Sequence, residues 1–400
     1  MRRHIDFLFE NSLFLIAGVV AALVWANVHH DSYMAVSDFV ILPASLVGGH
    51  GVSVHFLVND VLMAFFFALA GKEIWEAMLP GGALRSLRTA STPVVCAAAG
   101  MAGPAAVYLL GAAWLGQLPS LGRGWAVPCA TDVALSYLVA KAVFGKNHVA
   151  IPFLLLLAIA DDAGGLIVLA AFYPQGPVQP AWLLLPAASV LIGLLMRRMR
   201  VNNFWLFLLL PGAISWTGFL LSGLHPALGL LPIIPTLPHM HPEGQEAVDR
   251  NGARKLGALY YFHVWWDRPV EVILGLFGLF NAGVVLSSFG GPSYLVLAAL
   301  LLGKPLGITL GGLLSVKLLR LRLPEGLNWR ELFVLGCAAG IGFTVSLFVA
   351  TVAFPVGPLR DAAKMGALAS GLAVATTVAA AKLLRIKSAR HLQIKQALES

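Results

Sequence analysis

Long apolar stretches joined by short connections are the feature that most restricts how this chain can fold. Hydrophobic residues make up 58% of its 400 residues, charged residues only 12%, and the mean hydropathy is +0.82. A soluble domain of this size needs a far larger polar surface. A transmembrane helix needs roughly 20 apolar residues. We therefore predict an all-α polytopic membrane protein with twelve spans, at 12–29, 58–78, 91–115, 125–144, 150–173, 181–196, 203–221, 223–237, 259–287, 294–317, 331–354 and 362–384.

The positions of Lys and Arg test this topology independently through the positive-inside rule. The segment 27–71 contains neither residue, and the alternate connections are the basic ones. With both termini in the cytoplasm, 23 of the 27 basic residues fall inside, and Arg123, Arg360 and Lys364 fall outside. Lys304 remains within a span. The alternation predicts twelve helices with both ends cytoplasmic, and it excludes a basic surface for nucleic acid.

The first outer connection contains a smaller signal. Two β-prone runs, Val40–Val47 and Val52–His55, lie on either side of the turn-forming stretch Gly48–Gly51. They predict a short extracytoplasmic β-hairpin whose unpaired edge could join a second protomer. An apolar loop lying on the membrane explains the same residues equally well.

Four charged residues lie within predicted spans: Asp132, Asp161, Asp162 and Lys304. An ionised group at the bilayer centre costs roughly 2.5–3.5 kcal/mol even on the lenient insertion scale. Salt bridges that merely pin helices together are the structural alternative. Three carboxylates and one ammonium leave a net negative charge, however, so the cluster must bind cations, take up protons or be hydrated.

The adjacent pair Asp161 and Asp162 suggests what that chemistry is. Desolvation and like-charge proximity both favour the protonated form of at least one of them, and their titrations should be coupled. A Na⁺ or Li⁺ ion neutralises the same charge, and carboxylate oxygens are the hard ligands that such ions prefer. Protons and cations would therefore exclude one another, which is the minimal requirement for exchange. If the two carboxylates exchange two protons for each monovalent cation, the exchange moves net charge and is electrogenic.

The backbone near these charges is predicted to be interrupted. The run Pro128–Asp132 should break the fourth span, and Gly336, Gly340 and Gly342 should loosen the eleventh. Carboxylates suit the N-termini of broken half-helices and ammonium groups suit their C-termini, so Asp132 and Lys304 are candidates for these positions. Glycine-rich spans can also be close-packing surfaces. Two interruptions in corresponding places, helices 3–5 and 10–12, favour the functional interpretation.

Several motifs resemble those of the NhaA family of sodium/proton antiporters, in order and over nearly the whole chain. They are Ala130–Ala134, Leu157–Asp162, Asn281–Val284, Gly303–Ile308, Leu323–Gly326 and Gly340–Ser346. The resemblance implies antiport of Na⁺ or Li⁺ against H⁺ by alternating access, with inverted-topology repeats formed by helices 3–5 and 10–12. It also implies a bacterial inner membrane, a role in sodium and pH homeostasis, and no cofactor.

The resemblance further implies roles for individual residues. Asp161 and Asp162 would bind the transported ion and carry protons. Lys304 would pair with one of them when the ion is absent, and Thr131, Asp132 and Thr344 would lie where the two interrupted helices cross. A single domain, 1–400, would contain a core bundle at about 91–173 and 294–384. The remaining helices would form the dimer bundle of a homodimer, joined partly by the outer hairpin.

The chain departs from the family's pattern where the family senses pH. Gly71-Lys72-Glu73-Ile74-Trp75-Glu76-Ala77 replaces the usual Gly-Leu-Glu-Ile-Lys-Arg-Glu, and Asp267-Arg268-Pro269 replaces the usual His-Pro-Trp pattern. Glu73 and His225 are the candidates for pH sensing that remain. A lone histidine at a helix end is more often structural, so both interpretations of His225 stay open.

Two other functional classes were weighed against transport. An intramembrane aspartyl protease needs two carboxyls facing each other across a water, whereas neighbours on one helix point about 100° apart. The sequence therefore predicts that the chain is not an enzyme. A cation-binding sensor or degenerate transporter, with altered pH regulation, is the stronger rival, because the end of the second span is rewritten.

Overall fold

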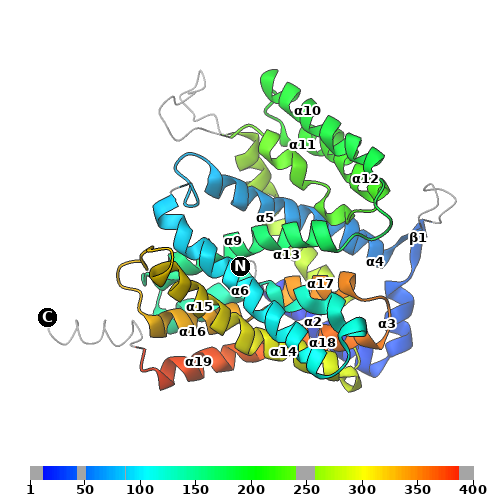
Figure 1. Ribbon diagram of the computed structural model, residues 1–400. Coiled ribbons are helices and arrows are strands. Elements are labelled where there is room, and N and C mark those ends of the chain that lie inside the picture. The colour runs from blue at the N-terminus through cyan, green and yellow to red at the C-terminus, as the bar shows by residue number, and fades with distance from the viewer. Residues whose placement is uncertain (1–11, 43–50, 86, 240–256, 387–400) are drawn as a thin grey trace, which may run out of the picture. The chain divides into compact units, whose positions relative to one another are not determined.

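The computed structural model describes residues 12–42, 51–85, 87–239 and 257–386 (Figure 1). They fold into helices and one two-stranded sheet. The chain divides into two compact units. The described part of the first unit comprises residues 87–165 and 281–386, and that of the second comprises 13–42, 51–85, 166–239 and 257–280. The division falls within helix α9, after Gly165.

The second unit contains the N-terminal helices and the middle of the chain. Its elements are α2 (Leu13–Val28), α3 (His30–Ser37), β1 (Val40–Leu42), β2 (Val52–Ser53), α4 (Val54–Phe56), η2 (Leu57–Leu62), α5 (Met63–Met78), η4 (Pro180–Leu183), α10 (Leu184–Arg198), α11 (Phe204–Phe207), η5 (Leu208–Gly212), α12 (Ala213–Ser222), η6 (Pro226–Leu228), η7 (Leu231–Thr236) and α13 (Ala258–Asn281). Close approach of backbones holds α2 against α13, because a Cβ at Gly18 would lie 2.0 Å from the carbonyl oxygen of Gly275.

The first unit contains both interrupted spans. Its elements are α6 (Leu87–Trp114), α7 (Leu118–Leu121), η3 (Gly122–Cys129), α8 (Val133–Phe144), most of α9 (Ala150–Phe172), η8 (Leu286–Ser288), α14 (Gly291–Ala298), η9 (Ala299–Gly303), α15 (Lys304–Lys317), α16 (Trp329–Ala339), α17 (Phe343–Ala353), α18 (Pro358–Ala369), η10 (Ser370–Leu372) and α19 (Ala373–Leu383).

The predicted spans can be compared with these helices one by one. Within the described residues, seven helical runs are long and apolar enough to cross a membrane, or nine if each of two bent pairs counts as one span. The other three predicted stretches coincide with the shorter helices α2 and η6–η7 and with α13, which carries Asp267, Arg268 and Glu271. The largest differences are the start of the fourth span, at Leu118 instead of 125, and the end of α13, at Asn281 instead of 287.

The connection between the first two predicted spans contains the predicted hairpin. Strands β1 and β2 pair antiparallel, with Val40 opposite Ser53 and Leu42 opposite Val52. The side chains of β1 are exposed. The predicted turn lies in 43–50, outside the described residues. The sequence prediction missed helix α3, which precedes the hairpin and begins with the polar residues His30, Asp31 and Ser32.

Small residues bring α6 and α15 of the first unit together, and this contact fixes the start of α15. A Cβ at Gly103 would lie 2.4 Å from the carbonyl oxygen of Gly303, and one at Gly307 would lie 2.3 Å from that of Ala99. Such close packing needs glycine on both helices. Gly303 immediately precedes Lys304, so the same contact positions the lysine.

Lys364, which the pattern of basic residues counts on the outer side, lies near the start of the last predicted span, inside α18, with its side chain only 5% exposed. Its neighbours Ala362, Ala363 and Gly366 are small and buried. They let α18 pack tightly, which buries the lysine stem along with them. Basic residues within 250–255 and beyond Ile386 lie outside the described residues.

Candidate cation and proton site

The fourth span is broken between η3 and α8. The two pieces are bent by 54°. Pro128 lies in the last turn of η3, and Ala130 and Asp132 adopt extended backbone conformations. The interruption leaves the carbonyl groups of η3 and the N–H groups of α8 without partners inside the helix. Other groups of the first unit satisfy both ends.

The eleventh span is broken in a similar way between α16 and α17, with a bend of 52°. Gly340, Ile341 and Gly342 separate the two helices. A Cβ at Gly340 would lie 2.8 Å from the carbonyl oxygen of Leu300. Only glycine allows that approach without displacement of the backbone. This close contact therefore requires glycine at position 340. The contact adds to the loosening of the helix that the glycines were predicted to cause.

The two breaks meet through direct hydrogen bonds. The N–H of Asp132 donates to the carbonyl of Ile341 at 2.7 Å. The hydroxyls of Thr131 and Ser136 donate to the carbonyls of Ala339 and Ala338, at 3.1 and 2.9 Å. The residues that end η3 and begin α8 thus satisfy carbonyl groups at the C-terminus of α16.

The Asp132 carboxylate accepts hydrogen bonds from the N-termini of two half-helices, α8 and α17. Its Oδ1 accepts from the N–H of Leu135 at 3.1 Å, which makes Asp132 the N-cap of α8. Its Oδ2 accepts from the N–H of Thr344 at 3.3 Å and also from the Thr344 hydroxyl, at the start of α17. Side chains of both residues are buried. One negative charge therefore faces two positive helix ends.

Lys304 lies on the other side of the fourth-span break. Its Nζ donates to the carbonyl of Cys129, the last residue of η3, and to Asp161 Oδ2 at 2.8 Å. The ammonium thus sits at a helix C-terminus, where the partial charge is negative. The lysine belongs to α15 and follows the π-helical turn η9. Neither side chain of the Lys304–Asp161 pair is exposed.

The two adjacent aspartates of α9 differ in their surroundings. Asp161 is buried, whereas Asp162 is partly exposed. The Oδ1 atom of Asp161 has no hydrogen-bond partner among the residues that the structure describes. The lysine therefore engages only one of the two carboxylate oxygens. A buried carboxylate with a free oxygen can accept a proton or a cation.

Comparisons with known proteins bear on this arrangement of residues. The chain is 46% identical to the Na⁺/H⁺ antiporter NhaA of Jannaschia sp. (strain CCS1), with 97% of this chain and 99% of that protein covered. It is 45% identical to the Na⁺/H⁺ antiporter NhaA of Geotalea uraniireducens (strain Rf4), at 98% and 99% coverage. A family model described as Na⁺/H⁺ antiporter 1 matches residues 6–383. This chain belongs to the NhaA family.

Membership of the NhaA family decides several points left open by the sequence. The chain is a multi-pass membrane protein of a transporter family, which excludes the intramembrane protease. The named relatives come from bacteria.

Among solved structures, the sodium proton antiporter MjNhaP1 from Methanocaldococcus jannaschii at pH 8 matches with a TM-score of 0.48 and 16% identity, covering 95% of this chain and 97% of that one.

The two pH-sensing candidates of this NhaA-family chain lie in the second unit. Glu73 is exposed on α5, next to an ion pair between Lys72 and Glu76 at 2.8 Å. His225 is buried, and its Nδ1 accepts from the N–H of Ala227 as the N-cap of η6. The same nitrogen lies 3.6 Å from Asp60 Oδ1.

Sequence reasoning missed some polar groups of the NhaA-family fold. Asp60 is buried within the second span, in the π-helical turn η2, and its Oδ1 accepts from Gln175 Nε2 at 3.1 Å. It was assigned to a helix end because the span was predicted to start at residue 58. The role of Ser136 at the crossing was also missed. The signal for it was present, since Ser136 follows Asp132 by one helical turn and shares its face.

Proposed function

We propose that this chain exchanges Na⁺ or Li⁺ for H⁺ across the membrane, and that Asp161 and Asp162 bind the cation and carry the protons. The observation that carries the proposal is the Lys304–Asp161 pair beside two crossed helix breaks, in a chain of the NhaA family. Its relatives are named Na⁺/H⁺ antiporters. We infer that the exchange serves sodium and pH homeostasis.

Exchange follows from competition for one set of oxygens. A cation that binds both aspartates replaces the ammonium group of Lys304 at Asp161 Oδ2 and any proton held by either carboxylate. When the cation leaves, the buried charge must be neutralised again, because an uncompensated carboxylate is costly inside a membrane. Lys304 and protons supply that neutralisation. A charge-assisted bond of 2.8 Å is strong enough to compete with a weakly held monovalent ion.

Asp132 and the hydroxyls around it take no part in this competition in the proposed mechanism. Thr131, Asp132 and Thr344 keep the two breaks crossed, so that the half-helix ends stay next to the site. The cation then reaches the site from one side of the membrane and leaves to the other, by alternating access. Helices 3–5 and 10–12 would be the inverted repeats that form the core bundle. Loss of two protons per cation bound would make the exchange electrogenic.

The proposal is tested by Asp162→Asn in everted membrane vesicles. Addition of Na⁺ or Li⁺ should change the internal pH of vesicles that contain the wild-type chain, and should leave it unchanged in those that contain the variant. Asp31→Asn, which alters an exposed acid of α3, is the matched control and should behave as the wild type. Unaltered exchange in Asp162→Asn would contradict the proposal.

A cation sensor that binds without transport is the second candidate function. The rewritten sequence Lys72–Ala77 at the end of the second span favours it, since it replaces the basic pair and second acid that the family usually has there. Radioactive sodium flux into proteoliposomes distinguishes the two. A sensor would bind sodium and move none, whereas an antiporter accumulates the isotope against an imposed proton gradient.

A role of Glu73 and His225 in pH sensing is a separate part of the proposal. Glu73→Gln and His225→Asn each remove one titrating group, and Asn keeps an acceptor for the η6 cap. A shifted pH profile with an unchanged maximal rate would support sensing. A profile that coincides with that of the wild type would assign His225 to its cap alone.

We further propose a homodimer in the inner membrane with both termini in the cytoplasm. The exposed apolar side chains Val40, Ile41 and Leu42 of β1 support a hairpin contact, with exposures of 52%, 45% and 44%. Replacing Ile41 with Lys should shift the chain from dimer to monomer in detergent, measured by light scattering. Replacing the exposed Val28 of α2 instead is the control. Cysteine labelling of the termini in sealed cells tests their location.

A further inference from the structure

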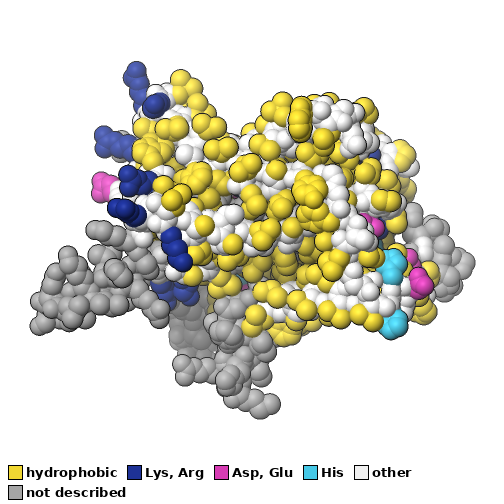
Figure 2. Space-filling model, turned by 90° about the horizontal axis from the view of Figure 1, so that it is seen from below, with side chains coloured by type: hydrophobic (Ala, Val, Ile, Leu, Met, Phe, Trp, Pro, Cys, Tyr) yellow, Lys and Arg dark blue, Asp and Glu magenta, His cyan; other side chains and the backbone are white. Residues whose placement is uncertain are grey.

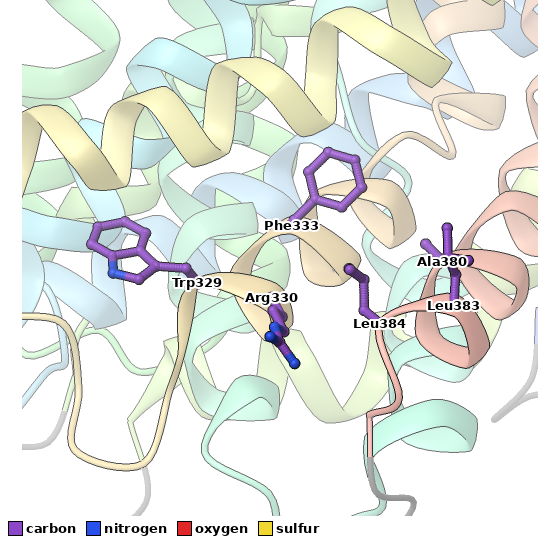
Figure 3. Close-up of a pocket in the computed structure, with 6 residues that line it drawn as sticks. All are labelled: Trp329, Arg330, Phe333, Ala380, Leu383 and Leu384. Carbon is purple, nitrogen blue, oxygen red and sulfur yellow. The ribbon is translucent and has the colours of Figure 1, made fainter.

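An apolar groove lies in the first unit between the start of α16 and the end of α19. Its volume is about 290 Å³, and it is lined by Trp329, Arg330, Phe333, Ala380, Leu383 and Leu384. Figure 3 shows three of these side chains coming from α16 and three from the end of α19. Ala380 and Leu384 also pack on the buried cluster around Leu332 and Leu335, so the floor of the groove belongs to the core of the unit.

The position of the groove suggests where in a bilayer it lies. Both helices reach polar connections here: α16 starts after the connection at 318–328, and α19 ends at Leu383. The exposed indole of Trp329 is typical of the level where lipid headgroups meet acyl chains. Leu383 is 83% exposed, and hydrophobic side chains are spread over much of the face seen in Figure 2. The groove therefore opens towards lipid at the membrane interface.

Three basic residues line the groove or adjoin its lining residues in the chain. Arg330 lines it, and the exposed Lys382 and Arg385 adjoin Leu383 and Leu384, at the end of α19 and just after it. Across the described ranges, none of the three forms an ion pair with a carboxylate. Glu331 does not neutralise Arg330, because it accepts from the N–H of Asn328 at 3.0 Å and faces His148 at 3.6 Å. Unpaired cations beside an apolar groove complement a negatively charged amphiphile.

We propose that this groove binds one anionic phospholipid. One acyl chain lies between α16 and α19, and the phosphate accepts hydrogen bonds from Arg330, with Lys382 and Arg385 adding attraction. The guanidinium group recognises phosphate through two parallel hydrogen bonds. The volume lies just below the roughly 300–1,000 Å³ typical of ligand sites, so the groove holds part of a single acyl chain. Anionic lipids are also enriched in the cytoplasmic leaflet, where basic clusters bind them.

A bound lipid would act on a functional part of the molecule. Helix α16 is the first half of the broken eleventh span, and its last carbonyls accept hydrogen bonds from Thr131 and Ser136. A lipid wedged between α16 and α19 would hold the start of that half-helix against the core. The binding site is separate from the aspartates, so lipid binding can be measured whether or not the chain exchanges ions.

The test measures lipid binding to the full-length chain in neutral detergent by native mass spectrometry. The probes are dioleoylphosphatidylglycerol, dioleoylphosphatidylcholine and inorganic phosphate. We expect one phosphatidylglycerol to be retained in preference to phosphatidylcholine. Arg330→Gln should weaken its binding at least tenfold, because it removes the charge-assisted hydrogen bonds of the guanidinium group. Ala380→Trp, which fills the groove, should abolish the specific binding.

Matched controls separate the groove from general effects of charge and size. Lys146→Gln removes an exposed cation elsewhere in the unit, and Ala375→Trp adds an indole to an exposed position of α19. Both should bind lipid as the wild type does. Equal retention of the two lipids, or unchanged binding in both groove variants, would overturn the proposal. Inorganic phosphate binding as tightly as the lipid would overturn it too, since the groove would then contribute nothing.

Discussion

Two buried carboxylates, one in each unit, are held in opposite ways. Asp60 of the second unit has a neutral amide donor, Gln175, and its backbone carbonyl accepts from Trp216 Nε1 at 2.8 Å. Asp161 of the first unit is held by a charged partner, Lys304, through one oxygen only. Burial is therefore common to both carboxylates, and the partner is what differs. In the proposed function, a transported cation replaces the charged partner of Asp161.

The largest effect should come from neutralising each carboxylate in turn. We expect Asp161→Asn to reduce sodium-dependent proton movement in everted vesicles to that of empty membranes, because the amide carries no negative charge for the cation and has no proton to exchange. Asp60→Asn should keep most of the activity, since an amide can still accept from Gln175. Equal losses of proton movement in the two variants would contradict the proposal that the two carboxylates have different roles.

The second effect concerns stability of the Lys304–Asp161 pair. Lys304→Gln should lower the free energy of unfolding by about 3–5 kcal/mol, the usual cost of leaving one buried charge without its partner. The double variant Asp161→Asn/Lys304→Gln should recover much of that loss while remaining inactive. Thermal unfolding in detergent measures the stability of the wild type, the two single variants and the double variant. Additive losses of stability would show that the two groups are not coupled.

A smaller effect is expected at the helix crossing. Thr344→Val removes a hydroxyl that donates to the Asp132 carboxylate, and should cost about 1.5–3 kcal/mol, as for bonds to charged groups. Thr351→Val, on the same helix α17, removes a hydroxyl that donates to neutral acceptors. It should cost about 1 kcal/mol. Thermal unfolding of the two variants side by side checks the ranking, which a larger loss in Thr351→Val would reverse.

The smallest effect should follow from Gln175→Ala. It removes the amide donor of Asp60 and should lower stability by about 1 kcal/mol without changing the apparent affinity for sodium. Gln179→Ala, at an exposed position four residues on, should stay within about 0.5 kcal/mol of the wild type. A changed sodium affinity in Gln175→Ala would mean that Asp60 belongs to the transport machinery after all.

Much of the fold could be predicted from the sequence because the signals are averages over many residues. Hydropathy is summed over a whole span, and Lys and Arg are counted over a whole connection. The breaks at Pro128–Asp132 and Gly340–Gly342 were predictable for a local reason, since proline and glycine disturb a helix wherever they occur. The π-helical turns η2, η5 and η9 were not. Such single π-helical turns inside α-helices have no simple sequence signal, and η2 contains Asn59 and Asp60, η5 contains Pro211 and η9 is apolar apart from Gly303.

The residues of the candidate site were predictable, but their pairing was not. Charges in a span attract attention because they are expensive, so Asp161 and Lys304 were found from sequence. Which aspartate Lys304 contacts depends on how α15 sits against α6 through Gly103 and Gly307, which no local pattern encodes. The burial of Lys364 was not predictable for a related reason. Its helix α18 has Arg360 and Asp361 near its start, and hydropathy alone does not show whether the stem of the following lysine packs inwards.

The shared cap at Asp132 has a mechanical consequence. A single carboxylate joins the starts of α8 and α17, so pulling these half-helices apart would leave at least one of them without an anion. The crossing should therefore move as one rigid unit. The half-helices α8 and α17 can tilt together while the angle between them stays the same. Force applied to either half-helix would then be felt at the other.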